Sequence, residues 1–73
     1  MNNYITPICD IQAGTVWTQT ISARNVTDCQ EKLSRLLIDK YDDLEDCLTY
    51  REFVALADKH DILIGEIKDI EEL

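Results

Sequence analysis

The sequence contains very few of the residues that interrupt regular structure. Two glycines and one proline occur in 73 residues, and no low-complexity tract, domain linker or internal repeat divides the chain. Hydrophobic residues make up 45% and charged residues 30%, which is too apolar a composition for a disordered protein. We therefore predict a single small domain over residues 1–73, with a core large enough for one sheet layer and one helix layer.

Long apolar runs and paired cysteines are also missing. No segment reaches the roughly 18 apolar residues of a membrane span, and the first twelve residues lack the basic start and apolar stretch of a signal peptide. Cys9, Cys29 and Cys47 are odd in number and form no C-x-x-C pattern, so neither a disulfide framework nor a zinc site is expected. These features predict a cytoplasmic protein with reduced thiols and no membrane partner.

Recognisable catalytic and metal-binding patterns are absent. His60 is the sole histidine, and there is no Gly-rich phosphate loop, nucleophile elbow or H-E-x-x-H pattern. The acidic residues between 39 and 46 invite comparison with a calcium-binding loop. That comparison fails because, counting from Asp39, the sixth position is Leu44 instead of glycine and the twelfth is Tyr50 instead of glutamate. The sequence thus predicts a non-enzymatic protein without a cofactor or metal.

Positive charge is scarce, and the formal net charge is −8. Residues 1–27 balance to zero, whereas the last 46 residues hold 14 Asp and Glu against 6 Lys and Arg. Direct binding to nucleic acid or to an anionic membrane is disfavoured, because a phosphate partner would be repelled.

Two amphipathic helices are the clearest features that are present. The first, over residues 27–41, has an apolar stripe and a T-x-x-Q capping box from Thr27 to Gln30; the stripe consists of Cys29, Leu33, Leu36, Leu37 and Tyr41. An acidic link follows over residues 42–46. The second helix is predicted from Tyr50 to about His60, with Thr49 as its N-cap and Leu48 packed against Phe53 as a hydrophobic staple.

Three segments are rich in β-branched and aromatic residues and are predicted as strands, over residues 4–11, 15–23 and 62–67. From Lys68 the tail either extends the third strand or frays. Pro7 cannot donate to a sheet ladder, which favours an edge position for the first strand. If the two helices are antiparallel, the third strand runs antiparallel to the second and pairs beside it.

The register of the first hairpin depends on its loop. A two-residue Ala13-Gly14 loop would divide the apolar residues between the two faces of the sheet. A three-residue loop, residues 12–14, pairs Ile11 with Thr15 and Cys9 with Trp17 and gathers the apolar residues on one face. We predict the three-residue loop, with Gly14 in the left-handed conformation. The core face then holds Ile5, Cys9, Ile11, Trp17, Ile21 and Ala23.

Together these elements predict an α+β fold of ββααβ order, in which a three-stranded antiparallel sheet carries both helices on one face. Two surfaces are candidate binding sites. One is the open face of the sheet, predicted to present Tyr4, Thr6, Ile8, Val16, Thr18 and Thr20. The other is an acidic surface formed by Asp39, Asp42, Asp43, Glu45 and Asp46.

The leading functional prediction is a small acidic protein-interaction module. In size, acidity and hairpin-then-helix layout, the chain resembles the small accessory proteins of bacteriophages and mobile elements, among which anti-CRISPR and anti-restriction inhibitors are found. That resemblance implies an alternative function, in which the carboxylates imitate a phosphate backbone and occupy the channel of a basic nucleic-acid-binding protein. A second alternative is a homo-oligomeric or particle structural subunit, and a homodimer would use the open sheet face.

Overall fold

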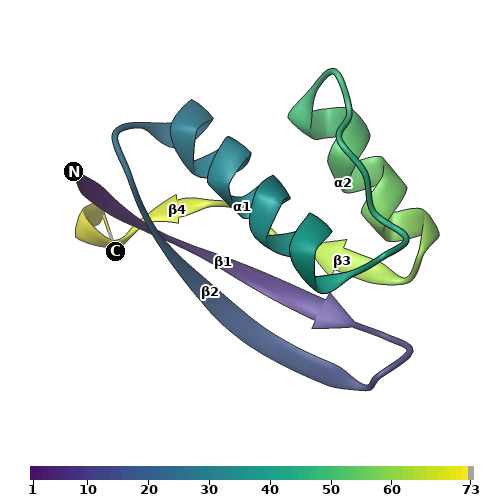
Figure 1. Cartoon of the computed structure of the whole chain (residues 1–73). Helices are drawn as coiled ribbons and strands as arrows, with labels where there is room; N and C mark the ends of the chain where they lie inside the picture. The colour runs from purple at the N-terminus through teal and green to yellow at the C-terminus, as the bar shows by residue number, and fades with distance from the viewer. Residues whose placement is uncertain (73) are drawn as a thin grey trace.

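The structure is a computed structural model that describes residues 1–72. The chain begins with two strands of nine residues each. The elements in order are β1 (Asn2–Asp10), β2 (Thr15–Ala23), α1 (Val26–Lys40), α2 (Tyr50–Lys59), β3 (Ile62–Ile64), β4 (Lys68–Asp69) and a 3-10 turn, η1 (Ile70–Glu72). Both helices lie on the same side of the sheet (Figure 1). The predicted α+β fold and ββααβ order are confirmed. The third strand is shorter than predicted, and part of the tail forms β4.

The strand order is β2-β1-β3, with β4 also paired to β1, and every pairing is antiparallel. The prediction that β3 pairs with β2 and leaves Pro7 at the edge was wrong. It assumed an antiparallel helix pair, but the linker over residues 41–49 runs back along α2 (Figure 1). As a result, α2 begins beside the first half of α1, and β3 runs parallel to β2 and pairs with the far side of β1.

Pro7 is accommodated in the central strand β1 because it lies opposite the segment between β3 and β4. Its carbonyl oxygen accepts a hydrogen bond from Gly65 N at 2.8 Å. In an antiparallel ladder the N and C=O of one residue point to the same neighbour, so the proline nitrogen also faces the segment between β3 and β4. The β1–β2 ladder therefore loses no donor. Gly65 permits this approach, because a Cβ there would overlap Pro7 Cγ and lie 3.2 Å from the Pro7 carbonyl oxygen.

The first hairpin has a four-residue loop, residues 11–14, and pairs Asp10 with Thr15. The predicted three-residue register was wrong by one residue, which places the opposite face of β1 against the helices. Asp10 explains the longer loop: its carboxylate accepts hydrogen bonds from Ala13 N at 3.1 Å and from the Tyr41 hydroxyl at 2.9 Å. Gly14 does have positive φ, at 69°.

The helices bury the stripes that the sequence indicated. Cys29, Leu33 and Leu37 of α1 are fully buried, as are Phe53 and Ala57 of α2; Tyr4, Ile8, Ile21, Ala23, Leu44 and Ile62 complete the core. Thr49 is the N-cap of α2, as predicted, and accepts from Glu52 N. Two local predictions were wrong. The N-cap of α1 is Asn25 instead of Thr27, and Leu48 is 96% exposed, so it forms no staple.

Candidate interaction surfaces

The sheet leaves one face uncovered by the helices, and we call it the outer sheet face. Alternation along the paired strands gives this face the side chains of Asn3, Ile5, Pro7, Cys9, Val16, Thr18, Thr20, Ser22, Leu63 and Lys68. Val16, Thr18 and Thr20 are exposed there, as predicted. Tyr4, Thr6 and Ile8 were predicted on the same face, but they are 4%, 1% and 1% exposed and belong to the core. The one-residue change in register is the cause.

Apolar side chains cross the outer sheet face from one strand to the next. Cys9 pairs with Val16 on one side and with Leu63 on the other. Val16 is 73% exposed and Leu63 42% exposed. Among these strand positions, only Lys68 has a charged side chain. In the whole protein, 30% of the residues are charged. The outer sheet face is therefore far less charged than the rest of the molecule.

Sequence reasoning missed Ile5, Pro7, Cys9 and Leu63 as members of this face. It assigned Ile5 and Cys9 to the core because that choice united the apolar residues of the hairpin. A usable signal was Asp10, since aspartate at the first position of a turn accepts a hydrogen bond from the backbone further along the chain. A four-residue loop directly after Asp10 gives the observed register.

The acidic surface lies along the linker. Asp39, at the end of α1, and Asp42, Asp43, Glu45 and Asp46 are all exposed. Leu44 is only 4% exposed and anchors the middle of the linker in the core, so two acidic pairs flank a fixed point. Among the side chains of residues 1–71, the ion pairs join Asp28 to Arg24 and Lys32, and none involves the linker. In the same part of the chain, no three His, Cys, Asp or Glu side chains are grouped to hold a metal ion.

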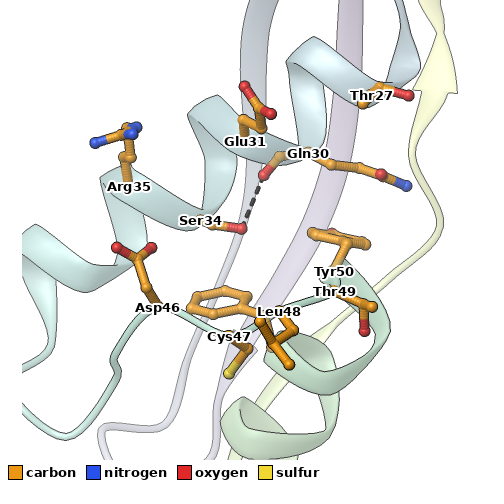
Figure 2. A pocket seen from close by; sticks show the side chains of 11 residues that line it. Thr27, Gln30, Glu31, Ser34, Arg35, Asp46, Cys47, Leu48, Thr49 and Tyr50 are labelled. Atoms are coloured by element: carbon orange, nitrogen blue, oxygen red, sulfur yellow. Dashed lines mark hydrogen bonds between the residues drawn. The ribbon is translucent and has the colours of Figure 1, made fainter.

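A pocket of about 410 Å³ separates the first half of α1 from the end of the linker. Figure 2 shows its two walls, with Gln30, Glu31, Ser34 and Arg35 on α1 and residues 46–50 across from them. The Ser34 hydroxyl donates to the Gln30 carbonyl at 2.8 Å and is thereby occupied. Tyr50 has a buried hydroxyl without a partner among the described residues, and burial raises its pKa to about 12. The polar side chains of the two walls do not converge on a common point in the pocket, as they would in a ligand-binding site (Figure 2).

Two of the three thiols, Cys29 and Cys47, lie in environments that disfavour the thiolate. Burial raises the pKa of Cys29. Burial also raises the pKa of Cys47, with further contributions from the negative charges of Glu52, Glu45 and Asp46. Because the thiolate is the nucleophilic form, neither position favours nucleophilic chemistry. His60 is the C-cap of α2, where its backbone N–H bonds to Ala57 and Asp58 carbonyls.

The fold and these surfaces define an α+β domain with an acidic linker between its helices and a nearly uncharged open sheet face. Comparison with protein-family models, with curated proteins and with solved structures gives no match. None of the helices in the described chain combines the length and the apolar character that crossing a bilayer requires.

Proposed function

We infer that this chain is a non-enzymatic protein-interaction module that binds a partner protein through the outer sheet face. The observation that carries the proposal is the composition of this face, where exposed Val16 and Leu63 flank the half-buried Cys9 and Lys68 is the single charge. Depletion of charge and exposed apolar side chains are typical of the centre of a protein interface. Three free thiols fit a reducing compartment, and we propose a cytoplasmic location.

Affinity capture with matched variants tests this proposal. The wild-type chain, Leu63→Lys and Ala55→Lys are each used to capture proteins from a lysate of the source cells, at low and at high salt. Ala55 is exposed on α2 and controls for the added charge. Docking on the outer sheet face predicts a partner that survives high salt, is lost with Leu63→Lys and is retained with Ala55→Lys. Equal capture by all three proteins would contradict it.

A second candidate is an acidic inhibitor that occupies the channel of a basic nucleic-acid-binding protein. It is supported by the exposed carboxylates of Asp42, Asp43, Glu45 and Asp46 on a linker fixed by Leu44, because a basic groove responds to the spacing of negative charges. Charge reversal at these four positions, tested in competition with DNA for a basic nuclease, should abolish inhibition. Unchanged inhibition would exclude the linker as the mimic.

A further inference from the structure

β2 is an edge strand without the features that usually protect an edge. It is nine residues long and contains no proline, glycine or charged residue, and its pairing with β1 is continuous, without a bulge. Natural sheets blunt their edges with short strands, charges, prolines or bulges, because an exposed ladder recruits another strand. The opposite side of the sheet follows that rule, since β3 and β4 have three and two residues. Figure 1 shows no element of the described chain beyond β2.

The open hydrogen-bonding groups of β2 follow from the ladder. Pro7 directs its carbonyl toward Gly65, on the β3 side, so its partner Thr18 directs its backbone away from β1. By alternation, Val16 and Thr20 also point their N–H and C=O groups outward. Lys32 Nζ donates to the Ser22 carbonyl at 2.9 Å and closes that end of the edge. The Thr20 carbonyl accepts from the Gln19 side chain at 3.2 Å, a contact that a strand could replace.

The charge distribution also favours association through the β2 edge. Residues 15–40, which form β2 and α1, carry four Lys and Arg against three Asp and Glu, a net charge of +1. Residues 41–73 carry three Lys and Arg against eleven Asp and Glu, a net charge of −8. The strand order places β3 and β4 on the other side of β1 from β2. Two copies can therefore approach through β2 without bringing their acidic halves together.

We propose that β2 pairs with β2 of a second copy, antiparallel about a twofold axis at Thr18, to form one continuous sheet. This register pairs Thr18 with the same residue of the other copy and Val16 with Thr20, so these cross-strand pairs on the outer sheet face are β-branched. It uses the outward groups of all three residues. The occupant is a second copy because the exposed segment is uncharged and self-complementary, and because its half of the chain is nearly neutral.

Pairing of this kind has a geometric consequence. A twofold axis perpendicular to the sheet keeps both helix layers on one side, and it joins the two outer sheet faces into one surface. A nine-residue strand is about 30 Å long and three strands span about 14 Å, so one copy offers a footprint of about 400 Å². Standard interfaces bury about 800 Å² per partner. The joined outer sheet faces of two copies would reach about 800 Å². The pairing of β2 with β2 does not itself depend on the proposed function.

Sedimentation equilibrium from micromolar to millimolar protein tests the pairing. The wild-type chain should dimerise. Thr18→Lys and Thr18→Glu should each weaken the dimer about tenfold, because like charges would face each other across the axis, and mixing the two variants should restore it. A monomeric wild type, or single variants that dimerise as tightly as the wild type, would overturn the proposal. Circular dichroism checks that each variant is folded.

Leu63→Lys distinguishes edge pairing from stacking of two outer sheet faces. It adds the same charge on the same face but lies on β3, away from the β2 edge, so the dimer should persist while partner capture is lost. Loss of the dimer with Leu63→Lys would overturn edge pairing. Amide hydrogen exchange needs no variant: protection of the Val16, Thr18 and Thr20 amides should rise with concentration, whereas concentration-independent exchange would contradict the proposal.

Discussion

Two buried polar side chains on the core face of β1 have different environments. Asp10 accepts hydrogen bonds from Ala13 N and Tyr41 Oη, and these hydrogen bonds, led by the one from Ala13, hold its pKa below the ordinary value. Thr6 is 1% exposed, and its hydroxyl has no partner among the described residues. Asp10 therefore stabilises the hairpin turn and the end of α1, whereas Thr6 loses the hydrogen bonds that its hydroxyl would make with water.

Asp10 should make stability depend on pH. Because its folded pKa is depressed, its contribution is fully present above the unfolded pKa, about 3.9, and is lost as pH falls through the folded pKa. Asp10→Asn should lower the melting temperature at neutral pH, and the difference from wild type should vanish below the folded pKa. Thermal melts of both proteins across pH check this. The backbone N–H of Arg24 lowers the pKa of Asp28 as well, so some acid sensitivity should remain in the variant.

Thr6→Val should increase stability. The substitution replaces an unpartnered buried hydroxyl with a methyl group of similar size, and leaving such a group unpaired costs about 1–3 kcal/mol. We expect a gain of about 1 kcal/mol in the free energy of unfolding, measured by urea denaturation. Thr18→Val, on the exposed outer sheet face, is the matched control and should change stability by less than about 0.5 kcal/mol. A clear loss with Thr6→Val would show that the hydroxyl has a partner in solution.

At the scale of single elements, both helices are held by a capping side chain and a buried stripe. Asn25 accepts from Asp28 N at 2.8 Å, and Thr49 accepts from Glu52 N at 3.2 Å. Of the α1 stripe, Cys29, Leu33 and Leu37 are fully buried, and Leu36 and Tyr41 are partly buried against the core. The positions of the stripes follow from helical periodicity, whereas the N-cap of α1 depends on how the chain leaves β2 at Ala23.

Alanine substitutions at the two candidate caps of α1 separate the observed cap from the predicted one. Asn25→Ala should cost about 1 kcal/mol, because the N–H of Asp28 loses its acceptor. Thr27→Ala should cost less than about 0.5 kcal/mol, because Thr27 is an exposed residue of the first turn. Urea unfolding of both variants gives the comparison. A larger loss with Thr27→Ala would restore the T-x-x-Q capping box.

For the molecule as a whole, the dominant feature is the separation of charge from the outer sheet face. Residues 41–73, which include the linker, α2, β3 and β4, carry a net charge of −8, and residues 1–40 sum to zero. The two ion pairs among the side chains up to Glu71 both involve Asp28 of α1, with Arg24 and Lys32 as the partners. Repulsion among the acidic residues therefore opposes folding on one side of the molecule only.

Added salt should stabilise the protein. Screening reduces repulsion between exposed carboxylates, and the Debye length falls from about 10 Å at 0.1 M to about 3 Å at 1 M salt. The melting temperature should rise with sodium chloride at pH 7. The rise should be smaller in a variant carrying Asp42→Asn and Asp43→Asn, which removes two of the repelling charges. A melting temperature that falls with salt would show that attractive pairs outweigh repulsion.

The sequence by itself determined the elements and their class. Periodicity placed the stripe of α1 and the start of α2, β-branched segments placed the strands, and these together predicted an α+β protein of ββααβ order. The acidic side chains predicted on the linker are exposed in the structure as well. Each of these features depends on residues close together in the chain, whose local preferences do not require knowledge of a distant neighbour.

Only the tertiary structure decided the strand order and the side of β1 that faces the helices. The register depends on the hydrogen bond between Asp10 and Tyr41, which are 31 residues apart. The central position of the strand that contains Pro7 depends on the contact with Gly65, in the segment between β3 and β4. A one-residue slip reverses every side chain of a strand, so it transferred Tyr4, Thr6 and Ile8 from the open face to the core. The free edge of β2 is therefore a product of long-range contacts, which local sequence patterns do not encode, whereas the Asp10 turn was a local signal for the register of the outer sheet face.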